Sequence, residues 1–130
     1  MKNGSGEIRT FKDLVVWQKA FELAFEIYRV TKSFPSDERY GLTAELRKTA
    51  RSVPYNIAEG HRRETTTEYI RFLNIGAGSA AELETQLLLA QRLGYFQEET
   101  AEQVLFQREE VDRMLNALVR SLKSRRSARS

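Results

Sequence analysis

Residues 52–60 of this chain read SVPYNIAEG and place a proline where the surrounding residues spell an amphipathic helix. Proline in a helix interior removes one backbone hydrogen bond and clashes with the preceding turn, which costs roughly 3 kcal/mol. We therefore expect Pro54 to bend this helix, and Asn56 and Glu59 beside it to repair the local hydrogen bonding. Gly60 is expected to end the helix. The alternative is that Asn56 and Glu59 form a ligand site, although one carboxylate and one amide are too few groups for a typical catalytic site.

Apolar residues recur at helical spacing on both sides of this segment. Four helices are expected, over residues 11–34, 37–59, 65–93 and 98–122. Ser36 and the acids after it are a good start for the second helix, and Thr65–Glu68 is a capping box for the third. The connections are only a few residues long, which favours antiparallel neighbours. The sequence therefore predicts an all-α, up-down-up-down four-helix bundle whose second helix is bent at Pro54.

The first expected helix has more apolar surface than packing on one core requires. One stripe along it comprises Val16, Ala20, Leu23, Ile27, Val30 and Phe34. A second stripe beside the first comprises Leu14, Trp17, Phe21, Ala24, Phe25 and Tyr28. The two stripes cover about half of the circumference, whereas a surface helix needs an apolar arc of roughly 100°. Either this helix is central, or it also meets another subunit through Leu14, Trp17, Phe21 and Phe25.

The third expected helix contains GAGSAA at residues 76–81. Gly76 and Gly78 each cost a helix about 1 kcal/mol relative to alanine, so we expect the small surface to serve close packing. The contact is either with a helix of the same subunit or with another subunit. A phosphate-binding loop is not expected, because no strand precedes the glycines and no Gly-Lys-Ser/Thr follows them.

The composition excludes several function classes. The 130 residues fit one domain and include no cysteine and one histidine, which excludes disulfides, zinc–thiolate sites and metal sites built on paired histidines. No enzyme constellation is found, so we expect a non-enzymatic protein without a metal or cofactor. No apolar run approaches the roughly 20 residues of a membrane span. The N-terminus lacks a secretory apolar segment, so a cytoplasmic protein with no membrane partner is expected.

Charge is distributed unevenly along the chain. The net charge is +3, and the five cations after residue 119 are Arg120, Lys123, Arg125, Arg126 and Arg129. Residues 1–119 alone therefore carry a net charge of −2. We expect residues 1–10 and the basic tail at 123–130 to be disordered, flanking a bundle at 11–122. The tail either binds the phosphates of RNA or DNA or is a solubilising terminus.

Further basic residues lie on and after the second expected helix. Arg47, Lys48 and Arg51 are on the helix, and Arg62 and Arg63 follow in the next loop. These cations are either a solvated face paired to glutamates or a cluster that meets RNA phosphates and bases. With the tail cations Lys123, Arg125, Arg126 and Arg129, they are the candidate nucleic-acid contacts.

Three segments resemble the bacterial four-helix bundle protein family, whose members were first noticed as products of intervening sequences in 23S rRNA genes. The segments are LVVWQKAFELAFEIY at 14–28, FPSDERYGLTAELRKTARSVPYNIAEG at 34–60, and EYIRFLNIGAGSAAELETQLLLAQRLGY at 68–95. Two blocks are the most specific: Pro-x-Asn-Ile-Ala-Glu-Gly at 54–60 and Gly-Ser-x-x-Glu-Leu-Glu at 78–84. The resemblance covers residues 11–120 and implies a four-helix bundle that assembles as a ring-like homopentamer.

A related group is the accessory variability proteins of diversity-generating retroelements. Those proteins form similar barrels, bind a reverse transcriptase and contact nucleic acid through basic surfaces. The family supplies no catalytic residues, so none is carried over. We expect a non-enzymatic, oligomeric helical scaffold that binds RNA, DNA or a nucleoprotein partner. The alternative is a protein-interaction oligomer, such as a reverse-transcriptase accessory protein, with no direct nucleic-acid contact.

Overall fold

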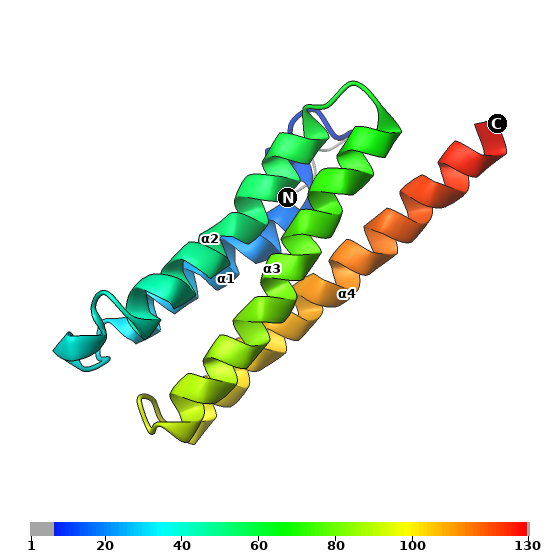
Figure 1. The fold of residues 1–130 in the computed structure, drawn as a ribbon. Coiled ribbons are helices and arrows are strands. Elements are labelled where there is room, and N and C mark those ends of the chain that lie inside the picture. The colour runs from blue at the N-terminus through cyan, green and yellow to red at the C-terminus, as the bar shows by residue number, and fades with distance from the viewer. Residues whose placement is uncertain (1–6, 130) are drawn as a thin grey trace.

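The computed structural model describes residues 7–129, and four long helices make up most of this range (Figure 1). They are α1 (Val15–Thr31), α2 (Leu42–His61), α3 (Thr66–Arg92) and α4 (Glu98–Arg129). Two short 3-10 helices, η1 (Phe11–Asp13) and η2 (Ser36–Glu38), precede α1 and α2. No strand occurs within residues 7–129. The chain is therefore all-α in this range, as the sequence predicts.

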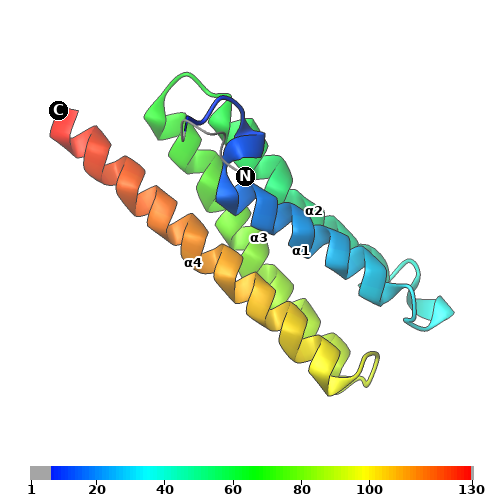
Figure 2. The same ribbon diagram turned by 180° about the vertical axis from the view of Figure 1, so that it is seen from behind.

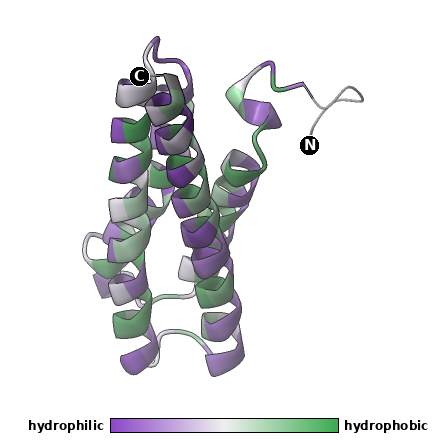
Figure 3. Cartoon of the chain, turned by 90° about the vertical axis from the view of Figure 1, so that its right-hand side faces the viewer, coloured by the Kyte–Doolittle hydropathy of each residue, from purple (hydrophilic) through white to green (hydrophobic). Residues whose placement is uncertain are grey.

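The helices form an antiparallel bundle. Each helix runs opposite to the one before it, and the two opposed views show the α1–α2 pair lying beside the α3–α4 pair (Figures 1 and 2). α1 contacts α2 and α4, and α3 contacts the same two helices, so the four close around one core. Hydrophilic and hydrophobic residues alternate around the helices (Figure 3). The predicted up-down-up-down bundle is confirmed.

The core contains the apolar residues that helical spacing predicts. Every member of the first apolar stripe is buried, from Val16 in α1 to Phe34, which lies just beyond the end of α1 at Thr31. α2 buries Leu42, Leu46, Ala50, Val53 and Ile57. α3 and α4 complete the core with leucines, valines and alanines that are almost fully buried. None of the helices described over residues 7–129 is long and apolar enough to cross a lipid bilayer.

The first helix begins later than expected. Leu14 is extended, with a ψ of 124°, and separates η1 from α1. The Thr10 hydroxyl accepts from the Lys12 amide while Asp13 accepts from the Thr10 amide, so a reciprocal capping box marks the start of η1. Residues 1–6 of the segment expected to be disordered lie outside the described residues.

The second helix also begins later, at Leu42 instead of residue 37. Gly41 precedes it and supplies no capping side chain. Glu38, in the connection between α1 and α2, caps the helix instead. Its Oε1 accepts from the Leu42 amide at 2.9 Å, and its Oε2 accepts from the Tyr95 hydroxyl at 2.7 Å. These hydrogen bonds to the charged carboxylate, the Leu42 amide first, lower the pKa of Glu38. One carboxylate thus caps α2 and joins both connections at this end of the bundle.

Pro54 lies inside α2, which continues as one helix from Leu42 to His61. The Asn56 side chain donates to the Ser52 carbonyl at 2.8 Å, not to the Ala50 carbonyl that loses its amide partner to the proline. Glu59 pairs with Arg63 one turn further along. The expected repair is therefore wrong for Glu59, and Asn56 bonds a different carbonyl. The bend itself stays a prediction.

Gly60 and Gly78 differ from their expected roles, whereas Gly76 is buried against α2. Gly60 does not end α2; it is buried, and a Cβ there would lie 2.9 Å from the Phe72 Cβ and 3.2 Å from the Tyr69 carbonyl. At Gly76 a Cβ would meet α2 at ordinary distances, 3.6 Å or more. At Gly78 it would meet nothing within 4 Å. The close approach of α2 and α3 therefore depends on Gly60.

The fourth helix is longer than expected. It continues to Arg129, seven residues beyond the predicted end at Leu122. The Arg126 guanidinium donates to the Thr67 hydroxyl at 3.2 Å, which attaches the added turns to the start of α3. The segment expected to be a disordered tail is thus helical through Arg129.

Candidate nucleic-acid interface

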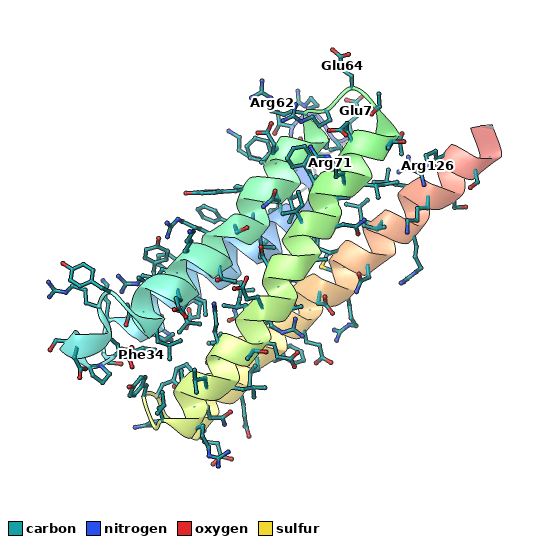
Figure 4. All side chains as sticks on the ribbon, in the orientation of Figure 1. Glu7, Phe34, Arg62, Glu64, Arg71 and Arg126 are labelled. Carbon is teal, nitrogen blue, oxygen red and sulfur yellow. The ribbon has the colours of Figure 1, made fainter. Side chains whose placement is uncertain are left out.

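Basic side chains gather at the end of the bundle where α2 meets α3 and α4 terminates. Figure 4 shows Arg62, Arg71 and Arg126 at this end, with Phe34 at the opposite one. We call this surface the basic end, and its members are Arg62, Arg63, Arg71, Lys123, Arg125 and Arg126. The helical extension of α4 carries three of these cations to the α2–α3 connection. A tail in coil would not fix them there.

Part of the basic end is already paired. Arg63 forms an ion pair with Glu59, and Arg71 forms one with Glu68 at 3.1 Å. Both guanidiniums also lie over the ring of Phe72, at 4.7 Å and 4.5 Å from its centroid. The Arg71 hydrogen bond lowers the pKa of Glu68. These pairs hold two arginines against the protein surface, which leaves them partly neutralised.

The remaining cations at this end are open to solvent. The side chains of Arg62, Lys123 and Arg125 are exposed and make no hydrogen bond or ion pair with the described part of the chain. Exposed, unpaired cations at one end of a bundle are suited to contact phosphate oxygens. The side chain of Arg129, the last predicted contact, lies outside the described residues.

Two of the predicted cations on α2, Arg47 and Arg51, bond to α1 and not to the basic end. The Arg47 guanidinium donates to the Thr31 hydroxyl at 2.8 Å and lies 5.0 Å from the ring centre of Tyr28. Arg51 donates to the Tyr28 hydroxyl at 3.1 Å. Arg47 is also fifteen residues before Arg62, or about 22 Å along the helix axis. Arg47 and Arg51 therefore attach α2 to the end of α1 and do not belong to the basic end.

Lys48 faces a third direction. It is exposed and lies beside α3, in a groove with Glu45 and Glu82. The eight predicted nucleic-acid contacts whose side chains are described are thus divided among the basic end, the α1–α2 seam and the α2–α3 seam. Sequence proximity on one helix was not enough to bring them together.

The aromatic residues of α1 form an exposed apolar face. Trp17 stacks on Phe21 with ring centres 5.0 Å apart, and Phe11 contacts the other side of Trp17 at 5.2 Å. Phe21 is 50% exposed and Phe25 is 60% exposed in the single chain. Leu14 and Trp17 are partly buried and pack against the core. We call Trp17, Phe21 and Phe25 the aromatic face.

The sequence analysis did not identify Arg108 as a buried charged residue. Arg108 is 6% exposed and donates to the Ala80 carbonyl at 3.0 Å, with Glu84 at 3.8 Å. A signal was present, because Arg108 stands at a core position of α4, four residues after Val104 and three before Val111. Within residues 7–129, no three histidine, aspartate or glutamate side chains are grouped closely enough to hold a metal ion.

Comparison with solved structures finds the same architecture. A crystal structure of a protein of unknown function from the S23 ribosomal protein family of Bacteroides thetaiotaomicron is similar to this chain with a TM-score of 0.77. The two are 24% identical, and the similarity covers 84% of this chain and 98% of the other. At this identity the likeness shows the shared fold. A search of curated proteins found no match.

A family model agrees with the residues that carry the sequence resemblance. The model describes the 23S rRNA-intervening sequence proteins and matches residues 12–117, which include both signature blocks and all but the last part of α4. The relation to the accessory variability proteins stays a prediction. The match spans most of the chain, and the protein therefore belongs to the 23S rRNA-intervening sequence protein family.

Proposed function

We propose that this protein is a non-enzymatic, oligomeric helical scaffold that binds RNA through its basic end. The observation that carries the proposal is that Arg62, Lys123 and Arg125 are exposed at one end of the bundle and come from two distant chain segments. None of the three has a partner in the described part of the chain that would compete with a phosphate. Membership of a family named for rRNA intervening sequences supports RNA as the first nucleic acid to test.

Binding of this kind is electrostatic and depends on salt. Each phosphate neutralised on a single strand contributes about −0.7 to the slope of log affinity against log salt, so three contacts give a slope of about −2. Affinity per chain would then fall roughly 20-fold between 50 and 200 mM salt. In an oligomer several basic ends act together, so avidity raises the total affinity.

Fluorescence anisotropy with a labelled single-stranded RNA, measured over a salt series, tests the proposal. The variant Arg62→Glu/Arg125→Glu should weaken binding and reduce the salt slope by about 1.4, because it removes two of the three contacts. The matched control is Arg39→Glu/Arg92→Glu, which makes the same charge change on exposed, unpaired arginines at the opposite end of the bundle. It should leave the slope nearly unchanged.

Two results would refute this assignment. Absence of RNA and DNA binding at low salt would favour the protein-interaction alternative, in which the arginines are only solvated. Equal losses in the two double variants would show that net charge, and not the basic end, determines binding.

Self-association through the aromatic face completes the proposal. Two phenylalanines that are half or more exposed on one helix form an apolar surface of the kind that protein interfaces cover. Phe21→Glu/Phe25→Glu should reduce the assembly to a single chain in native mass spectrometry, and five is the subunit number that the family resemblance implies. Tyr40→Glu, at an aromatic residue that is 89% exposed in a connection, is the control. An unchanged mass in the double variant would exclude this face.

A further inference from the structure

A small pocket lies where the connection between α1 and α2 meets both helices, at the end of the bundle that Phe34 marks in Figure 4. Its volume is about 310 Å³. Its polar lining residues are Thr31, Lys32, Ser36, Arg39, Thr43 and Arg47. Three of these residues are cations, and no acidic residue of the described chain lines the pocket. We call this cavity the cationic pocket, and it lies at the opposite end of the bundle from the basic end.

The positive charge of the cationic pocket is not compensated by carboxylates. Lys32 and Arg39 are exposed, and their side chains form no ion pair or hydrogen bond within the described residues. Arg47 donates to a hydroxyl and a backbone carbonyl, and neither carries a charge. Asp37 and Glu38 are the acids of the connection, and neither lines the pocket. The Glu38 carboxylate already accepts two hydrogen bonds. The three cations therefore give the pocket a charge of +3.

The guanidinium of Arg47 is held in a fixed orientation. Its Nε donates to the Thr31 hydroxyl at 2.8 Å, and its Nη2 donates to the Tyr28 carbonyl at 3.3 Å. Thr31 is 2% exposed, and its own hydroxyl donates to the Ile27 carbonyl at 2.7 Å, so it is oriented to accept from Arg47. A guanidinium has five N–H donors, and these two bonds leave the others available to a ligand. Because the planar group is already ordered, it loses little entropy when it binds an oxyanion.

The hydroxyl of Thr43 lacks a partner although this residue is almost fully buried. Thr43 is 7% exposed and lies in the first turn of α2. Its Oγ1 forms no hydrogen bond within the described residues, and it is not among the unpartnered polar atoms that the protein seals from solvent. Since Thr43 lines the cationic pocket, the pocket is where this hydroxyl meets solvent. A hydroxyl in this position can donate a hydrogen bond to the oxygen of a ligand.

We propose that the cationic pocket binds a phosphate group, either as free inorganic phosphate or as the monoester of a small molecule. A phosphate monoester carries a charge of about −1.5 to −2 at pH 7 and has three strong acceptor oxygens. Its charge matches Lys32, Arg39 and Arg47, and one of its oxygens can accept from the Thr43 hydroxyl. A phosphodiester of a nucleic-acid backbone has a single charge and fewer free oxygens, so it matches the pocket less well. This site is separate from the RNA contact proposed for the basic end.

The test is isothermal titration calorimetry of the full chain in a chloride buffer at constant ionic strength with three ligands. Inorganic phosphate and glycerol phosphate are mostly dianions at pH 7.5, whereas dimethyl phosphate is a diester with one charge, like the RNA backbone. We expect the two dianions to bind about tenfold more tightly than dimethyl phosphate, because each gains an additional charge-assisted contact.

Two variants test the residues of the cationic pocket. Arg39→Gln removes an exposed cation without altering the core and should weaken phosphate binding about two- to fivefold. Thr43→Val keeps the branched shape of the side chain, removes the hydroxyl and should weaken binding about fivefold. The matched control is Arg92→Gln, at an exposed, unpaired arginine that lies at the same end of the bundle but does not line the pocket. It should bind phosphate as the parent does.

The ligands also separate the two sources of the phosphate group. Binding of both dianions identifies a monoester as an accepted ligand, whereas binding of inorganic phosphate alone identifies the free anion. The proposal is overturned if neither dianion binds, if dimethyl phosphate binds equally well, or if Arg39→Gln and Arg92→Gln weaken binding equally. An unchanged affinity in Thr43→Val would overturn the contact with the hydroxyl. Because the variants leave the cations of the basic end unaltered, the outcome is independent of RNA binding there.

Discussion

Gly60 and Gly78 lie inside helices, and alanine should have opposite effects on stability at the two positions. Both substitutions gain about 1 kcal/mol of helix propensity, because glycine loses more backbone entropy on folding. The surroundings then decide the sign. The Cβ of Gly78→Ala would enter open space, so the whole gain should appear as added stability.

At Gly60 the same methyl group enters a packed contact. It would lie 2.9 Å from the Phe72 Cβ and 3.2 Å from the Tyr69 carbonyl oxygen, and neither atom rotates away with a side chain. Overpacking of this kind costs about 1–3 kcal/mol. After the propensity gain, Gly60→Ala should destabilise the fold by about 1 kcal/mol.

Urea unfolding followed by circular dichroism measures both effects, with all variants at one protomer concentration because assembly adds to apparent stability. In thermal melts, each kcal/mol corresponds to about 4 °C for a chain of this length. Gly76→Ala is the intermediate control, since its Cβ would meet α2 at 3.6 Å, and it should stabilise. Equal stabilisation at Gly60 and Gly78 would refute the packing argument. A change of oligomer mass in Gly78→Ala would show that Gly78 packs against another subunit.

Three other perturbations have defined outcomes. Glu38→Gln retains one acceptor oxygen and should lower the melting temperature at neutral pH. The pKa of Glu38 is lowered below 4.5 by its hydrogen bonds. The difference in melting temperature between the parent and the variant should therefore vanish as pH falls through that lower pKa. If the two melting temperatures still differ in acid, the negative charge of Glu38 does not strengthen its hydrogen bonds to the Tyr95 hydroxyl and the Leu42 amide. Arg47→Met should cost about 1 kcal/mol by removing the bond to Thr31, without changing RNA affinity in anisotropy. The free energy of unfolding of Arg108→Met, measured in urea, should be within about 1 kcal/mol of the parent, because an apolar side chain of similar length replaces a buried charge. A loss of several kcal/mol would show that the hydrogen bond from the guanidinium to the Ala80 carbonyl is essential for stability.

Local sequence signals predicted the helices but not all of their ends. Thr65 accepts from the Glu68 amide as the capping pattern indicates, so α3 begins within one residue of its expected start. The start of α2 was missed because its cap, Glu38, acts from outside the helix and is itself held by Tyr95, 57 residues away. The end of α4 was missed because its added turns are attached to Thr67 through Arg126.

The sequence alone determined the number of helices, their antiparallel order, the core-facing residues and the family. Helical periodicity and short connections are local properties, and the signature blocks can be read directly. Only the tertiary structure decided which cations are available, because a guanidinium is free or bound according to groups far away in the chain. Arg47 is held by α1, whereas the exposed Arg62 and Arg125 have no partner in the described part of the chain. The same reason applies to the glycine in SVPYNIAEG. The sequence predicts a helix end at Gly60, but the approach of α3 leaves no room for a Cβ at this position.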